Sequence, residues 1–390
     1  MFRFFTAGES HGQALTAWVS GLPLGVPVDI DFINRELQRR QAGYGRGGRM
    51  KIETDRIEIL SGVRHGKTIG SPVTLLIENK DWTNWEDSLP VEDKPVPEEK
   101  QRPVTQPRPG HADLAGALKY NLKNARYILE RASARETAAR VAAGAVAKQF
   151  LQHFGIEILS HVVALGDVRL ERNAQWEEIV SACKETNAPF RCADKSLEEK
   201  MKTLVDRATK ERDSLGGIFE VVAHDTPPGL GSHTQWDEKL DGQLAQAVLS
   251  IQAVKAVEMG NGVKGATSFG SEVHDEIGYD AAAKRFTRPT NHAGGLEGGI
   301  TNGEDVIVRG YLKPISTLRR PLASVDLETK EAVQAAYERS DVCVVPAAGV
   351  IGEAMVALTL TRAVREKFGG DTLEEALRNF HAYQQQLESF

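Results

Sequence analysis

The sequence predicts an α+β protein, because two helices rich in small apolar residues occur together with short runs that alternate like strands. Residues 130–148 are rich in Ala and Val from Arg135 onward, which is typical of a helix buried in the middle of a molecule. Residues 342–360 predict a second buried helix that follows Asp341. The segments 51–53, 56–60 and 73–77 alternate and predict antiparallel strands.

The remaining elements are predicted from the same patterns. Strands are expected at 15–19, 156–165, 216–223 and 306–310, and helices at 29–40, 237–250 and from 373 onward. Asp29 or Asp31 is expected to cap the first of these helices. Residues 83–107 are rich in Pro and acid and predict a long surface loop that is mobile or acts as a lid. Residues 170–214 are expected to be a charged, peripheral helical stretch.

Composition limits the classes of function. The chain has 390 residues, is 41% hydrophobic and has a formal net charge of −6, so a polyanion-binding surface over the whole protein is not expected. Three cysteines without C-x-x-C spacing indicate a reduced, cytoplasmic protein without a structural zinc site or other metal. We expect no secretory signal and find no apolar run that would be long enough to span a bilayer.

Basic residues are concentrated at glycine-rich turns and helix starts. Residues 39–51 combine four Gly with four Arg, and such a loop suits phosphate or carboxylate groups. A solvated loop and an RNA-binding segment are the alternatives, although the acidic chain and its few aromatics argue against RNA. Further cations of this kind are Arg108, Arg131, Arg135, Lys313 and Arg339. Their spread along the chain favours one domain, residues 1–390, folded around one site for small anionic ligands.

The obvious proton-handling groups are two turn histidines and one aspartate. Ser10 and His11 lie in a tight glycine-flanked turn, where the pair can bind phosphate or donate a proton. His111 lies in a second turn beside Arg108, and Asp113 is expected to cap the helix that follows. An ordinary surface histidine remains the alternative for each. The chain contains no P-loop, no G-x-G-x-x-G after a strand, no H-E-x-x-H and no G-x-S-x-G.

Six motifs together resemble the chorismate synthase family. They are GESHG at 8–12, RRQAGYGRGGRMKIE at 39–53, SGVRHGKTIGSP at 61–72, RPGHADL at 108–114, RASARETAARVAAGAVAK at 131–148 and RSDVCVVPAAGVIGEA at 339–354. The resemblance runs along nearly the whole chain and is weakest over 83–103 and 170–212. It implies a helical core between antiparallel sheets, a homotetramer, and an anti-1,4-elimination that converts 5-enolpyruvylshikimate 3-phosphate into chorismate and phosphate with reduced FMN.

The resemblance also implies residue roles. His11, with Ser10 beside it, would protonate the departing phosphate, His111 would balance the flavin's charge, and Asp341 would assist proton removal. The residues implied to hold the substrate, or NADP, are Arg40, Arg46, Arg49 and Arg135, with Arg339 also contributing to the substrate. Those implied to hold FMN are Arg131, Ala132, Ser133, Gln252, Ala253, Gly298, Lys313, Pro314, Ile315, Ser316, Thr317 and Arg339. Ala132 stands where many members have Ser, so a hydroxyl contact is lost there.

Two other functions remain to be compared with this one. Some family members also reduce flavin with NADPH, but they contain extra sequence that this compact chain lacks, so a separate flavin reductase is expected to supply reduced FMN. An RNA-binding protein using the Arg-Gly loop would be retained on single strands in a salt-sensitive way. We expect neither a nucleic-acid nor a membrane partner.

Overall fold

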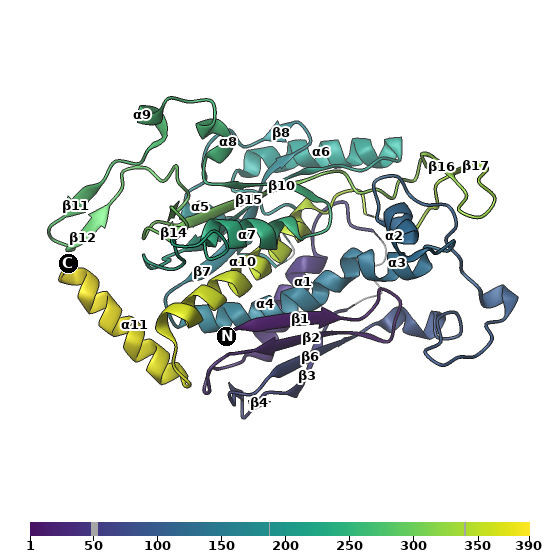
Figure 1. The fold of residues 1–390 in the computed structure, drawn as a ribbon. Coiled ribbons are helices and arrows are strands. Elements are labelled where there is room, and N and C mark those ends of the chain that lie inside the picture. Colours follow the sequence, from purple (N-terminus) through teal and green to yellow (C-terminus); the bar gives the residue numbers. More distant parts are fainter. Residues whose placement is uncertain (48–53, 187, 339–340) are drawn as a thin grey trace.

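Two long helices form the centre of the molecule and lie between two antiparallel sheets (Figure 1). The computed structural model describes residues 1–47, 54–186, 188–338 and 341–390. The core helices are α4 (Thr137–Gln152) and α10 (Val345–Phe368). This arrangement confirms the predicted α+β fold with a helical core. The strand expected at 51–53 lies outside the described residues.

The two sheets differ in size and in the helix that they contact. The first has the order β1-β2-β6-β3, with β1 (Arg3–Ala7), β2 (Ala14–Ser20), β6 (Val73–Glu78) and β3 (Ile57–Ser61), and α4 packs on it. The second has the order β10-β15-β9-β7-β8, with β10 (Val254–Met259), β15 (Val306–Leu312), β9 (Gly217–His224), β7 (Glu157–Leu165) and β8 (Val168–Arg169). Helix α10 packs on β7 and β9.

Small residues allow the core helices to pack closely. A Cβ placed on Gly144 of α4 would lie 2.3 Å from the Cβ of Ala354 on α10. On the opposite side of α10, a Cβ on Gly352 would lie 2.5 Å from the ring of Phe219 in β9. Because non-bonded carbon atoms normally approach only to about 3.5–4.0 Å, both positions require glycine at this separation of the elements. The Ala- and Gly-rich composition is therefore a consequence of close packing.

The length of α10 corrects one expectation from the sequence. Its 24 residues are long and apolar enough to cross a membrane by length and composition alone, so an apolar run of that length does exist. However, 89% of its most apolar window is buried inside the protein. The central helix of a protein core satisfies the same criterion, and α10 occupies that place (Figure 1).

The predicted continuous helix over 130–148 is wrong at one residue, Ser133. Helix α3 (Arg126–Ala132) ends there, because Ser133 is extended, with φ −61° and ψ 139°. A 3₁₀ turn, η4 (Ala134–Glu136), then leads into α4. As a result, Arg131 lies at the end of α3 and Arg135 lies in η4, although only four residues separate them in the sequence. The break instead places Ser133 and the start of η4 beside a cavity.

Most other elements agree with the sequence. Helix α1 (Ile30–Gln41) begins after Asp29, whose side chain accepts a hydrogen bond from the Asp31 N–H. Helix α7 (Leu240–Leu249) buries Leu240, Leu244 and Val248 as predicted. The C-terminal helix is α11 (Leu373–Glu388). The charged stretch 170–214 contains α5 (Trp176–Cys183) and α6 (Lys195–Glu211), which pack against β7 and β8 respectively. The expectation that this stretch is peripheral is wrong for part of it, because Phe190, Cys192 and Met201 are buried in the main core.

Shorter elements complete the described structure. They are β4 (Val63–Arg64), β5 (Lys67–Thr68), η2 (Lys80–Asn84), η3 (Glu98–Lys100), α2 (Asp113–Tyr120), α8 (Gly262–Gly265), α9 (Gly270–Val273), β11 (Gly278–Asp280), β12 (Arg285–Thr287), β13 (Leu296–Glu297), β14 (Ile300–Thr301), β16 (Ala323–Val325) and β17 (Ala332–Gln334). Elements α8 to β12 project from the body as an arm whose tip lies near the C-terminus (Figure 1). All three cysteines, Cys183, Cys192 and Cys343, are free.

Candidate active site

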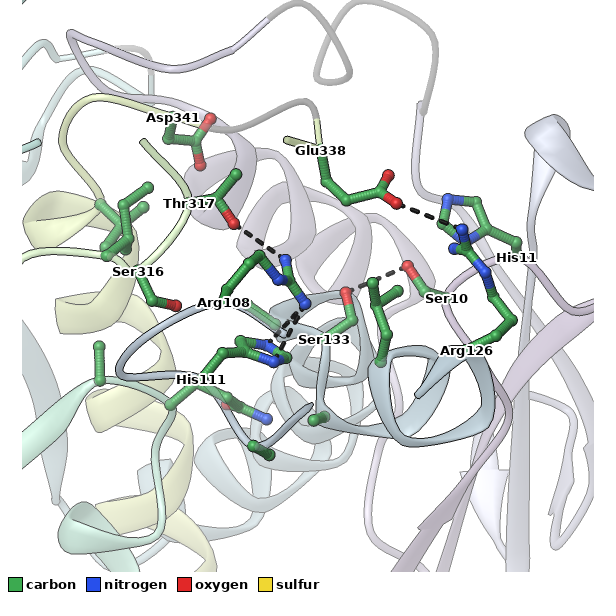
Figure 2. Close-up of a pocket in the computed structure, with 18 of the residues that line it drawn as sticks. Ser10, His11, Arg108, His111, Arg126, Ser133, Ser316, Thr317, Glu338 and Asp341 are labelled. Atoms are coloured by element: carbon green, nitrogen blue, oxygen red, sulfur yellow. Dashed lines mark hydrogen bonds and ion pairs between the residues drawn. The ribbon is translucent and has the colours of Figure 1, made fainter. Parts of the chain in front are cut away.

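A cavity of about 1070 Å³ lies where segments from distant parts of the chain meet (Figure 2). The 8–12 turn, the 81–85 segment, the 108–112 turn, the break at Ser133, and the loops at 252–253, 313–317 and 338–344 all contribute to its walls. The structure brings together here the predicted residues Ser10, His11, His111, Ala132, Ser133, Gln252, Ala253, Lys313, Ile315, Ser316, Thr317 and Asp341.

A smaller pocket of about 200 Å³ adjoins this cavity and contains the predicted arginines. Arg40, Arg46 and Arg135 line it, and it shares Ser133 and Asp341 with the large cavity. Three guanidinium groups in one small pocket suit the phosphate and carboxylate groups of a small ligand, because guanidinium binds both in bidentate geometry.

Asp55 holds two of these arginines in place. Its carboxylate lies 2.8 Å from Nη2 of Arg40 and 2.5 Å from Nη1 of Arg135. Burial opposes ionisation of this carboxyl, but the charges and hydrogen bonds of Arg40 and Arg135 outweigh it and lower the pKa of Asp55. Asp341 contacts the third arginine, with Oδ2 3.0 Å from Nη1 of Arg46. The pocket is therefore a preformed network of paired charges.

Some predicted residues lie elsewhere. Among the described residues, Arg131, Gly298 and Pro314 line neither pocket. Arg131 donates instead to the carbonyls of Gly8 and Thr6, at 3.0 and 2.9 Å. Gly298 lies in the β13–β14 turn. The predicted Arg49 and Arg339 lie outside the described residues.

The basic 39–51 segment is not a uniformly solvated loop where the structure describes it. Arg39 and Arg40 are only 7% and 3% exposed, which argues against both the solvated-loop and the RNA-binding alternatives for these two side chains. Arg39 points into the core and not into the cavity, since it contacts Glu36 at 2.7 Å and Glu353 at 2.7 and 2.8 Å. Adjacent arginines on α1 thus have separate roles, one in the core and one in the site.

His11 is buried between a carboxylate and an indole. Its Nδ1 lies 2.9 Å from Oε1 of Glu130, and its ring stacks on Trp85 with 4.0 Å between ring centroids and 26° between planes. Burial opposes ionisation of Glu130, but its hydrogen bonds and charge interactions with His11, and the charge of Arg126, lower the pKa of Glu130. The Ser10 hydroxyl lies 3.1 Å from that of Ser133 and connects this wall of the cavity to the helix break (Figure 2).

His111 forms a second histidine–carboxylate pair on another wall. Its Nδ1 lies 2.6 Å from Oδ1 of Asp113, and Nε of Arg108 donates to the same carboxylate at 2.8 Å. Nη1 of Arg108 donates to the Thr317 hydroxyl at 2.9 Å (Figure 2). Burial opposes ionisation of Asp113, but hydrogen bonds from His111 and Arg108 hold its pKa well below the ordinary range. The prediction that Asp113 caps the helix is wrong, because the N-cap of α2 is Ala112 and the carboxylate is engaged by Arg108 and His111.

A cation lies near the hydroxyl groups of the 313–317 loop. Nζ of Lys313 donates to the carbonyl of Gly110 at 2.7 Å, which joins this loop to the His111 turn. Partial burial, and secondly the charge of Lys255, lower the pKa of Lys313. Ser316 and Thr317 line the same side of the cavity. A lysine with two hydroxyls suits an anionic group such as phosphate.

Sequence reasoning missed several residues of the cavity wall. Trp85, Arg102 and Glu338 line it, together with Arg126, which pairs with Glu338 at 3.3 Å (Figure 2). Trp85 and Arg102 belong to the stretch expected to be a mobile loop or lid. Trp85 is buried, and Arg102 lies over its ring at 4.5 Å. Nothing in the local pattern distinguishes these residues from other surface residues, because their place at the cavity depends on segments that are distant in the sequence.

Comparisons with known proteins identify the family of this chain. A family model described as chorismate synthase matches residues 2–364. The chain is 61% identical to the chorismate synthase of Solibacter usitatus (strain Ellin6076) over the full length of both chains. It is 53% identical to that of Aquifex aeolicus (strain VF5), covering 100% of this chain and 98% of the relative. A crystal structure of a chorismate synthase superposes with a TM-score of 0.79 at 43% identity, covering 100% of this chain and 99% of the other.

These matches cover nearly the full length of the chain in sequence and in fold. The chain therefore belongs to the chorismate synthase family, carbon–oxygen lyases that form chorismate and phosphate from 5-enolpyruvylshikimate 3-phosphate in the final step of the shikimate pathway.

Proposed function

We propose that the large cavity binds reduced FMN and that the adjoining arginine pocket binds the anionic groups of 5-enolpyruvylshikimate 3-phosphate. The observation that supports this most strongly is the convergence of both histidines and Asp341 on two pockets that share a wall. One pocket has the size and mixed lining that suit a flavin, and the other has three arginines for a multiply charged substrate.

One unsatisfied group supports the fit of a flavin. Oε1 of Gln252 is buried and has no hydrogen-bond partner in the described part of the chain. The orientation of this amide is fixed, because its Nε2 donates to Glu136 at 3.0 Å and a flipped amide would place oxygen against oxygen. A buried hydrogen-bond acceptor without a donor costs free energy, and an N–H on the edge of a flavin ring would supply the missing donor.

The residues proposed to hold FMN follow from this placement. Ser133, Gln252, Ala253 and the 313–317 loop line the cavity, and Ala132 can contribute its backbone. Arg131, Gly298, Pro314 and Arg339 keep their proposed roles through the family resemblance alone. When bound, reduced FMN supplies electron density that assists the loss of phosphate and accepts the hydrogen removed from the substrate.

The protein's own groups are proposed to bind the substrate and to move protons. Arg40, Arg46 and Arg135, together with Arg49, hold the phosphate and carboxylates. His11 gives a proton from its ring to the departing phosphate, with Ser10 beside it. Asp341, at the junction of the two pockets, assists removal of the substrate proton, and general acid–base groups of this kind contribute about 10²–10⁴-fold each.

His111 is proposed to balance the negative charge of reduced FMN. Its carboxylate partner Asp113 and its neighbour Arg108 hold the ring at the cavity wall. We further propose a cytoplasmic homotetramer that obtains reduced FMN from a separate flavin reductase. The free cysteines support a reducing compartment. The alternative to a separate reductase is an intrinsic reductase activity, for which we propose that NADP binds at the arginine pocket.

The decisive experiment is an anaerobic assay of phosphate release. Purified protein with photoreduced FMN should release phosphate from 5-enolpyruvylshikimate 3-phosphate, whereas oxidised FMN should not support turnover. The His11→Ala and His111→Ala variants should each turn over more slowly by about 10²-fold or more while remaining folded, since both residues lie in turns. Absence of phosphate release with flavin demonstrably bound would refute the proposal. Oxidation of NADPH without any added reductase would favour the bifunctional alternative.

A further inference from the structure

One buried glutamate holds the His11 turn through three separate contacts. Glu130 is only 2% exposed. Its Oε1 lies 2.9 Å from Nδ1 of His11, and its Oε2 accepts the backbone N–H of His11 at 2.8 Å. The backbone carbonyl of Glu130 also accepts the N–H of Ser10 at 3.0 Å. Helix α3 and the 8–12 turn, which are far apart in the sequence, are therefore joined at two consecutive residues.

These contacts determine which ring nitrogen of His11 is available. A carboxylate can only accept, so the nitrogen that faces Glu130, Nδ1, must carry a proton. Within the described residues, Nε2 of His11 has no hydrogen-bond partner, and His11 lines the large cavity. The stack on Trp85 fixes the ring plane. The hydrogen bond to Glu130 and the stack on Trp85 therefore both oppose a rotation of the ring that would exchange the two nitrogens.

The surroundings favour an ionised Glu130. Arg126 lies 3.5 Å from its Oε1 and also pairs with Glu338 at 3.3 Å. An ionised carboxylate beside an imidazole stabilises the protonated ring, as electrostatic attraction is strong where water is excluded. Removing it would leave His11 with a buried N–H and no acceptor.

We propose that Glu130 is the positioning residue for His11: it fixes the ring with Nδ1–H inward and Nε2 toward the substrate's phosphate, and its charge stabilises the imidazolium before proton transfer. This rests on the proposed role of His11 as the acid. In that step the Nε2–H bond breaks and an O–H bond forms on the phosphate oxygen. His11 is left neutral, with Nδ1–H still donated to Glu130, and solvent later restores the proton.

The test compares two variants of Glu130 with a matched control. Glu130→Ala removes the acceptor, and Glu130→Gln keeps an acceptor oxygen but removes the charge. Glu220→Gln is the control, because Glu220 is also 2% exposed and pairs with a histidine, His161, at 3.0 Å, yet it does not line either pocket. Nitrogen-15 NMR of histidine-labelled protein measures the tautomer of His11, whose signals are assigned with His11→Ala, and phosphate release measures turnover.

We expect Glu130→Ala to lose the single Nδ1-protonated form of neutral His11 and to slow kcat by about 10²-fold, with a smaller change in KM. Glu130→Gln should keep the tautomer and recover part of kcat. The double variant His11→Ala/Glu130→Ala should be no slower than His11→Ala, because the two residues act as one unit. Glu220→Gln should leave the His11 signals and kcat unchanged.

Two results would overturn the proposal. One is an unchanged His11 tautomer in Glu130→Ala, and the other is a double variant whose losses multiply, which would indicate a merely structural role. These outcomes can be told apart from a failure of the proposed function. If His11→Ala releases phosphate like the parent, the acid role of His11 is wrong, while the NMR measurement still decides whether Glu130 orients the ring.

Discussion

The contact between Gly144 and Ala354 allows a quantitative test of how the core determines the fold. In Gly144→Ala, the new Cβ would lie 2.3 Å from the Cβ, 2.5 Å from the Cα and 2.9 Å from the carbonyl oxygen of Ala354. None of these atoms is the end of a flexible side chain, so α4 and α10 must move apart. Overpacking of this kind costs about 1–3 kcal/mol, and contacts with backbone atoms place it near 3.

Helix propensity acts in the opposite direction, since Ala is favoured over Gly by about 1 kcal/mol in a helix. The net loss in the free energy of unfolding is therefore about 2 kcal/mol. With an m-value of about 3 kcal/mol/M, the urea midpoint should fall by ~0.7 M. The control is Gly242→Ala on α7, where the nearest atom, the carbonyl oxygen of Trp236, is 3.9 Å away. There only the propensity remains, and the midpoint should rise slightly or stay unchanged.

Urea unfolding followed by far-UV circular dichroism and tryptophan fluorescence would measure both variants. We expect the urea midpoints of the two variants to shift in opposite directions, or at least to be clearly separated, although the chemical change is the same. If Gly144→Ala unfolds at the same urea concentration as the parent, or at a higher one, close approach of the core helices is not the reason for glycine at this position.

Two further predictions concern buried charges. Glu353→Gln should lower the free energy of unfolding by about 3 kcal/mol, because Arg39 and Lys148 lose a shared buried anion. Burial opposes ionisation of Glu353, but those two cations lower its pKa from 4.5 to about 2. A depressed folded-state pKa means that the contribution is complete above about pH 4.5 and is lost as pH falls toward 2, so acid unfolding should be less steep in Glu353→Gln. In the site, Asp55→Asn should raise KM for the substrate about 10-fold, because Arg40 and Arg135, which Asp55 joins, would lose their fixed geometry. Steady-state phosphate release measures this KM. An unchanged KM would contradict the role assigned to Asp55.

The sequence by itself determined the elements and the chemistry. Amphipathic or uniformly apolar periodicity is a local property, so the helices at 30–41, 240–249 and 345–368 were placed close to their observed positions. Charge pattern was equally informative, since arginines beside glycines in an acidic chain indicated a local anion site. The order of several long motifs indicated the family, which the full-length comparisons confirm.

Only the tertiary structure decided which of these residues meet. The break at Ser133 puts Arg131 at the end of α3 and Arg135 in η4, and it lies next to the point where Ser10 of the 8–12 turn contacts α3. Arg39 and Arg40 are neighbours in the sequence, yet one pairs with Glu353 and the other with Asp55. Buried charges select partners from segments that are distant in the chain, so their roles depend on which segments pack together, and no spacing within one segment determines that.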